Sequence, residues 1–188
     1  VTLVLFYLIA YYFIIFIYLF IPHHLPTKDC FVFSDCFFTI CDQTIKNSNV
    51  ISLLSVLLEG EPGCGKAALA SYLALHSGFP YVKIISPESL VKYMESGKYT
   101  AIYNTFEDRY KSPYSIIILD NIEKLIEYIR IGPRFSNLLL QTLSVYIKKL
   151  PPKKGKKMLI IGTTSSAPQL EELGLVECFD RRIHIPNL

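Results

Sequence analysis

Hydrophobic and polar positions divide the chain into two parts of different character. From Val1 to Ile21 only Thr2 lies outside the apolar and aromatic residues, and the first charged side chain is Lys28. From Val50 onward, short apolar runs alternate with longer segments of helical composition, separated by glycine, proline and serine. Short apolar runs bounded by turn residues predict buried strands, and their alternation with helices predicts parallel pairing.

The second part contains ten predicted elements. The predicted strands cover 53–58, 81–85, 115–119, 158–161 and 183–185, and the predicted helices cover 66–76, 87–94, 99–110, 135–150 and 168–173. Ser86 before Pro87 is typical of a helix start, because serine caps free N–H groups and proline suits the first turn. The apolar residues of 135–150 are expected in the core: Leu138, Leu139, Leu140, Leu143, Val145 and Ile147. This order predicts an α/β fold, a parallel five-stranded sheet flanked by helices, with ligands at the carboxyl ends of the strands.

Residues 1–21 are long enough to cross a bilayer, since a helix rises about 1.5 Å per residue and the hydrocarbon layer is about 30 Å thick. Two interpretations stay open: a transmembrane helix, or sequence that is not native to this protein, since the chain begins with Val1 rather than methionine. A signal peptide would begin with a charged region, which is missing. Residues 22–49 are predicted to be a connector, and 50–188 the folded domain.

Composition narrows the functional classes. Lys and Arg number 19 against 16 Asp and Glu, a net charge of +3, which disfavours a protein that coats nucleic acid. The five cysteines are odd in number and form no CxxC pair, which disfavours a metal site or a disulfide framework and favours a reducing, cytosolic compartment. They are Cys30, Cys36, Cys41, Cys64 and Cys178.

A glycine-rich loop joins the first predicted strand to the first predicted helix. It matches the pattern GxxxxGK in the context that the pattern requires. Glycines allow successive N–H groups to point at one anion, the helix start adds its dipole, and the lysine places a cation beside the β- and γ-phosphates. We therefore expect the loop to bind nucleotide phosphates through Gly60, Glu61, Pro62, Gly63, Cys64, Gly65, Lys66, Ala67 and Ala68.

Two positions near this loop depart from the hydrolytic pattern. Ala67 stands where the pattern has Ser or Thr, whose hydroxyl coordinates Mg²⁺. Asp120 ends the strand 115–119 and is expected to hold Mg²⁺ through water, but the next residue is Asn121, where hydrolytic enzymes usually carry a glutamate that polarises water. Glu123 follows two residues later and need not face the site. ATP binding is expected to survive these changes better than hydrolysis.

From about Gln43 to its end, the chain resembles the second ATPase module of the vesicle-fusing ATPases (N-ethylmaleimide-sensitive factors) of the AAA family. The stretches that carry the resemblance are Ser55–Gly60, Ile131–Asn137, Leu159–Ser165 and Ile183–Asn187. The resemblance implies an AAA-type P-loop fold in a homo-hexamer that uses ATP and Mg²⁺ to take apart SNARE complexes through soluble adaptor proteins. The family's helical lid, adaptor-binding domain and first ATPase module have no counterpart in these residues, so we expect an incomplete nucleotide site.

The resemblance also suggests roles for single residues. Ser165 falls where the family has a polar sensor of the γ-phosphate, although a polar turn at a strand end would look the same. Arg181 lies near the place of a neighbouring subunit's arginine finger, and a surface arginine is the alternative. Cys64 lies beside Lys66 and a helix start, which should make its thiol reactive toward maleimide, with protection by ATP.

The sequence therefore predicts an ATP-binding AAA module of a vesicle-fusing ATPase, with weakened or absent hydrolysis of its own. One alternative is a non-catalytic module that binds ATP to assemble a ring. The other is a membrane-anchored AAA chaperone, if 1–21 spans a bilayer. The expected location is the cytoplasm, peripheral to transport membranes, or integral to the membrane in the last case.

Overall fold

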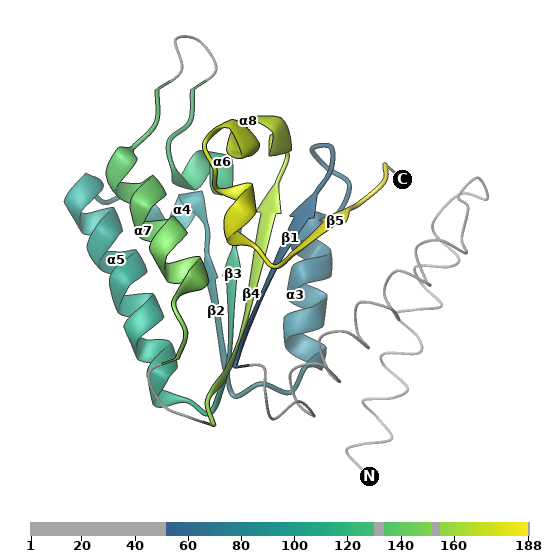
Figure 1. The fold of residues 1–188 in the computed structure, drawn as a ribbon, viewed down its shortest axis with the longest axis vertical. Helices are drawn as coiled ribbons and strands as arrows, with labels where there is room; N and C mark the ends of the chain where they lie inside the picture. The colour runs from purple at the N-terminus through teal and green to yellow at the C-terminus, as the bar shows by residue number, and fades with distance from the viewer. Residues whose placement is uncertain (1–51, 130–133, 152–154, 188) are drawn as a thin grey trace. The chain divides into compact units, whose positions relative to one another are not determined.

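The computed structural model describes residues 52–129, 134–151 and 155–187. Within these ranges five parallel strands form one sheet in the order β2-β3-β4-β1-β5 (Figure 1). The strands are β1 Leu53–Glu59, β2 Tyr81–Ile85, β3 Tyr114–Leu119, β4 Lys157–Thr164 and β5 Arg181–His184. Because all strands are parallel, their carboxyl ends lie along one edge of the sheet.

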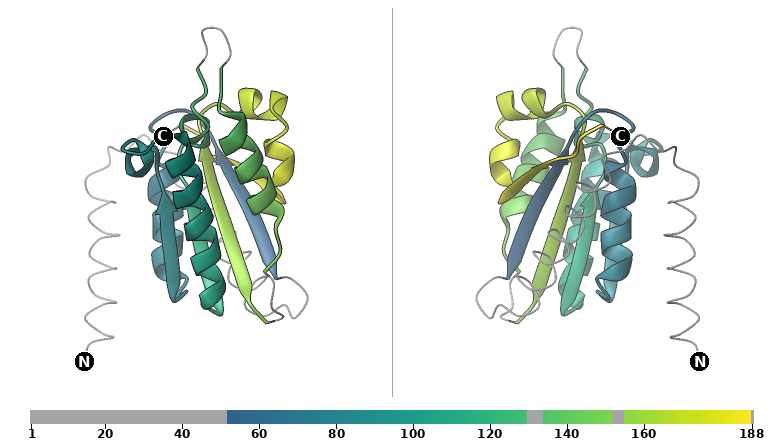
Figure 2. Two further views of the ribbon diagram at one scale, coloured as in Figure 1. Left: turned by 90° about the vertical axis from the view of Figure 1, so that its left-hand side faces the viewer. Right: turned by 90° about the vertical axis from the view of Figure 1, so that its right-hand side faces the viewer.

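Helices cover both faces of this sheet. Figure 2 shows α3 (Lys66–His76) on one side, and α7 (Asn137–Lys148) and α8 (Ala167–Glu172) on the other. Helix α5 (Glu95–Asp108) packs against α7, where the rings of Phe106 and Tyr146 lie 4.9 Å apart. The short elements are α4 Pro87–Leu90, α6 Ile122–Leu125, and the 3₁₀ turns η1 Arg109–Lys111 and η2 Val176–Cys178.

The core lies on both faces of the three inner strands. Side chains of a strand alternate between faces, so Leu57, Ile117 and Ile160 share one face and pack with α5 and α7. Val56, Ile118 and their neighbours point the other way, under α3, and are equally buried. An Ile-rich β3 buried on both faces is what a parallel sheet between two helical layers requires.

The fold class predicted from the sequence is confirmed. Strand β4 continues to Thr164, three residues beyond its predicted end at Ile161, and helix α3 has its predicted bounds. Ser86 caps α4 as predicted, with its hydroxyl accepting from the N–H of Ser89.

Some details were predicted wrongly. Helix α4 ends at Leu90 rather than at residue 94, and helix α5 begins at Glu95 rather than at residue 99. Helix α6 was not predicted. Leu138 and Val145 of α7 are 42% and 59% exposed, because residues seven apart share one side of a helix and this side faces away from the sheet.

The segments 1–21 and 22–49 lie outside the described residues, and their predicted boundaries stay predictions. Among the helices that are described, none is both long and apolar enough to span a membrane. The same part of the chain holds no cluster of His, Cys, Asp and Glu suited to a metal, and its two cysteines, Cys64 and Cys178, are free thiols.

Candidate functional site

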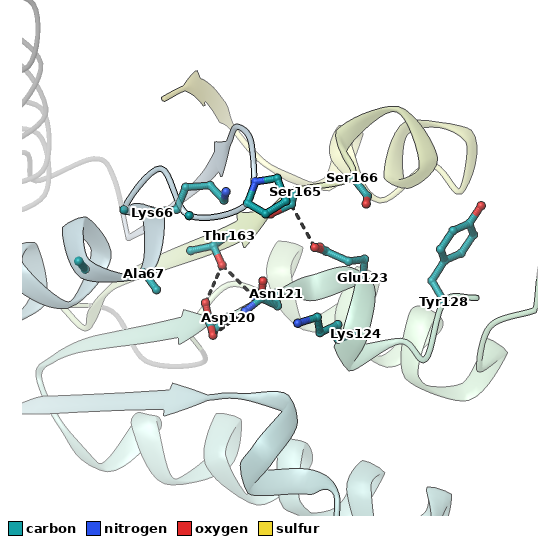
Figure 3. Close-up of a pocket in the computed structure, with 14 residues that line it drawn as sticks. Lys66, Ala67, Asp120, Asn121, Glu123, Lys124, Tyr128, Thr163, Ser165 and Ser166 are labelled. Atoms are coloured by element: carbon teal, nitrogen blue, oxygen red, sulfur yellow. Dashed lines mark hydrogen bonds between the residues drawn. The ribbon is translucent and has the colours of Figure 1, made fainter. Parts of the chain in front are cut away.

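A pocket of about 620 Å³ opens at the carboxyl ends of β1, β3 and β4 (Figure 3). This is the edge at which a parallel sheet is expected to bind ligands. Three segments line it: the loop after β1 with the start of α3, the α6 region after β3, and the end of β4. The lining residues are Pro62, Gly63, Gly65, Lys66, Ala67, Ala68, Asp120, Asn121, Glu123, Lys124, Tyr128, Thr163, Ser165 and Ser166.

The glycines of the loop are required by its backbone. Gly63 and Gly65 have φ of 89° and 84°, a left-handed conformation that other residues adopt only with strain. Gly65 immediately precedes α3, so the loop leads directly into the helix. A Cβ on Gly60 would lie 2.4 Å from the carbonyl oxygen of Ile185, which follows β5. The loop is therefore seated against the end of β5 and has no room for a side chain there.

Lys66 lies within the loop and is only 6% exposed. Its ammonium donates to the carbonyl oxygens of Gly60 at 2.9 Å and Glu61 at 2.6 Å. The Sγ of Cys64 lies 3.5 Å from the same nitrogen. A buried ammonium needs such acceptors, and the loop carbonyls supply them at the edge of the pocket.

The thiol of Cys64 is buried as well, with 6% of the residue exposed. Reagents reach a thiol only when it is accessible. The structure therefore opposes the expectation that Cys64 reacts readily with maleimide, even though Lys66 and the helix start lie beside it.

Opposite the loop, Asp120, Asn121 and Thr163 form a closed set of hydrogen bonds (Figure 3). The Thr163 hydroxyl donates to Asp120 Oδ1 at 2.8 Å and accepts from the Asn121 backbone N–H at 2.9 Å. The Asn121 side-chain amide donates to Asp120 Oδ2 at 2.9 Å. Asn121 is thus tied to Asp120, and its φ of 49° is one that asparagine tolerates better than most residues.

Glu123 is a pocket residue that sequence reasoning missed. It is 9% exposed, and its carboxylate accepts from the Thr164 hydroxyl at 2.9 Å and from the Ser165 backbone N–H at 3.1 Å. These contacts tie α6 to the end of β4. The sequence held one signal for this arrangement: Asn121 has a short polar side chain, which suits the residue before a helix. A helix that starts at Ile122 directs the side chain of Glu123 back toward the strand ends.

The structure brings most of the predicted site residues together. Pro62, Gly63, Gly65, Lys66, Ala67, Ala68, Asp120, Asn121 and Ser165 line the pocket. Gly60, Glu61 and Cys64 lie in the same loop but do not line it. Arg181 is exposed on β5 and is not part of this pocket. Its neighbour Arg182 pairs with Glu59 and Glu171, and the hydrogen bond that its guanidinium donates to Glu59 raises the pKa of that guanidinium.

The pocket fits phosphate groups better than a metal ion. Mg²⁺ is bound through oxygen ligands, and Ala67 supplies none. Both oxygens of Asp120 already accept hydrogen bonds from the chain itself. The residues present therefore do not fit a Mg²⁺ that the protein ligates directly.

Comparison with known proteins agrees with this geometry. The family model for AAA, the ATPase family associated with various cellular activities, matches residues 56–187. A vesicle-fusing ATPase of Dictyostelium discoideum is 50% identical over 146 residues, which is 78% of this chain and 20% of that protein. A vesicle-fusing ATPase of Arabidopsis thaliana is 51% identical over 146 residues, 78% of this chain and 20% of that protein.

A fungal relative gives the same result. The vesicular-fusion protein SEC18 of Saccharomyces cerevisiae is 44% identical over 144 residues, 77% of this chain and 19% of that protein. The chain thus spans about a fifth of the length of the curated relatives it matches.

Proposed function

The chain belongs to the AAA family of ATPases, and from that premise we propose that it is the ATP-binding module of a vesicle-fusing ATPase. One observation carries the proposal: the loop 60–67 and the strand ends with Asp120 and Ser165 face each other across one pocket, with Lys66 at its edge. Backbone N–H groups of a glycine loop at a helix start, with a lysine, suit the phosphates of a nucleotide.

The same pocket supports ATP retention more than ATP turnover. Hydrolysis needs a group that positions or polarises the attacking water. Asn121 cannot accept a proton usefully, and its amide already donates to Asp120. Ala67 removes the hydroxyl that would ligate Mg²⁺. We therefore assign this module a structural nucleotide that holds subunits of a homo-hexameric ring together.

At the level of the whole protein, the proposal follows the names of its relatives. Vesicle-fusing ATPases at 50% and 51% identity support a role in vesicle-mediated transport. The substrates proposed are SNARE complexes, reached through soluble adaptor proteins, and the proposed location is the cytoplasm beside transport membranes.

ATP binding is tested by calorimetry on the full chain. We expect saturable binding of ATP, and a loss of at least about tenfold in affinity for Lys66→Ala, because the variant lacks the cation at the phosphate loop. Lys83→Ala is the matched control, since Lys83 is exposed on β2 and does not line the pocket. Absence of ATP binding by the unaltered chain would overturn the proposal.

Turnover is tested separately by steady-state phosphate release in the presence of Mg²⁺. We expect the unaltered chain to release phosphate no faster than Lys66→Ala. The double variant Ala67→Thr with Asn121→Glu restores a hydroxyl and a carboxylate and should raise the rate. Glutamate at the left-handed position 121 is strained by about 1–2 kcal/mol, so folding of the variant is checked by circular dichroism. Phosphate release by the unaltered chain clearly faster than by Lys66→Ala would refute retention.

A further inference from the structure

The hydrogen bonds around Asp120 determine what this carboxylate can do. The Thr163 hydroxyl accepts from the Asn121 backbone N–H at 2.9 Å, so its proton is left to donate to Asp120 Oδ1. The second oxygen receives the Asn121 amide. A metal ion approaching Asp120 would meet two donors that already stabilise the carboxylate, and the hydroxyl that should ligate it from position 67 is missing.

A second cation is available at the same place. Lys124 of α6 lines the pocket and is exposed, and Figure 3 shows its side chain directed toward Asn121. Among the described residues Lys124 has no carboxylate partner within ion-pair distance. The two acidic side chains of the lining, Asp120 and Glu123, instead accept hydrogen bonds from β4 and α6. Lys124 therefore faces the pocket with its charge uncommitted.

We propose that this pocket binds ATP without a protein-ligated Mg²⁺, and that Lys124 and Lys66 supply the two cations that face the phosphates. The inference rests on the proposed ATP binding and adds its metal dependence and a new contact residue. An ammonium close to a phosphate offers the charge complementarity that a metal ion otherwise provides. Lys66 does so from the loop after β1, and Lys124 does so from the helix after β3.

Metal dependence is measured by calorimetric titration of ATP into the full chain, once with Mg²⁺ and once with EDTA. We expect the two dissociation constants to agree within about threefold. A loss of affinity of about tenfold or more in EDTA would overturn the inference and leave the proposed function standing. Absence of binding in both titrations would remove the proposed function and the inference with it.

The Lys124 contact is tested in EDTA with Lys124→Met against Lys83→Met. The two variants make the same charge change at exposed positions, so folding and net charge are matched. We expect about a tenfold loss of ATP affinity for Lys124→Met and none for Lys83→Met, with the loss shrinking at high salt because exposed charges are screened. Equal affinities for the two variants would show that Lys124 does not contact the phosphates.

A gain of metal dependence gives the converse test. Ala67→Thr restores the hydroxyl that ligates Mg²⁺ in related phosphate loops. We expect this variant to bind ATP more tightly with Mg²⁺ than with EDTA, by about threefold to tenfold. A variant that remains indifferent to Mg²⁺ would show that residue 67 is not what removes the metal, contrary to the inference.

Discussion

The side chain of Thr163 links Asp120 to Asn121 on the polar face of the pocket. It is 1% exposed, donates to Asp120 and accepts from the Asn121 backbone. A buried polar group left without its partner costs more than the hydrogen bond itself contributed. This hydroxyl therefore joins the end of β4 to Asp120 and Asn121, which follow β3.

Replacing Thr163 by valine should show this dependence. Thr163→Val keeps the shape but leaves the Asn121 backbone N–H and Asp120 Oδ1 without the hydroxyl they bond to, so we expect a loss of about 1–3 kcal/mol in the free energy of unfolding. Thr163→Ser keeps the hydroxyl and should lose clearly less. Urea unfolding of the three proteins measures both. A loss for serine but none for valine would mean that the methyl group, not the hydroxyl, matters.

At the scale of elements, the close packing of β4 under α6 and the turn after η2 needs a glycine. A Cβ on Gly162 would lie 2.7 Å from Ile122 Cδ1 and 2.7 Å from Phe179 Cζ. No side chain can be added there unless the neighbours move. Ile122 begins α6 and lies between the pocket residues Asn121 and Glu123.

Gly162→Ala should therefore destabilise the fold by about 1–3 kcal/mol through overpacking. Adding Ile122→Val removes the Cδ1 methyl group and should recover part of the loss. Chemical unfolding of the single and double variants measures the coupling between the two positions. If the double variant loses the sum of the two single losses, the contact with Ile122 is not the cause.

The helices and strands also show how much of the fold could be predicted from the sequence. Helix α3 was predicted with its observed bounds, because its alanines and leucines favour a helix and Gly78-Phe79-Pro80 stops it. The three inner strands were found because their apolar runs are buried on both faces. Helix α6 was missed because four residues leave no periodic pattern.

For the site as well, contiguous patterns could be predicted from the sequence, and contacts between distant segments could not. The phosphate loop is contiguous in sequence, so its motif could be found without a structure. Glu123, Thr163 and Lys124 meet only because β3 and β4 are neighbours in the sheet, as the pairing of Leu119 with Gly162 shows. The exposed Leu138 and Val145 could not be told from core residues, since composition does not reveal which side of a helix faces the sheet.

At the scale of the whole molecule, ATP should protect the chain from heat. A ligand that binds only the folded state adds about 2.7 kcal/mol at a concentration one hundred times its dissociation constant. For a chain of this size, that corresponds to a rise in Tm of about 5–10 °C. Differential scanning calorimetry at such an ATP concentration checks the value, and Lys66→Ala, with its affinity at least about tenfold lower, should show about half of this rise or less. An unaltered Tm at saturation would contradict binding to the native fold.

The hydrogen bonds between Lys66 and the carbonyl groups of its own loop have a consequence for which anions the pocket binds. Because the Lys66 ammonium already has two carbonyl partners, an incoming anion must compete with them. Sulfate or inorganic phosphate offers one anionic centre for this exchange, whereas a triphosphate can meet the loop N–H groups and the lysine together. We therefore expect the pocket to bind a chain of phosphates more tightly than a single inorganic anion.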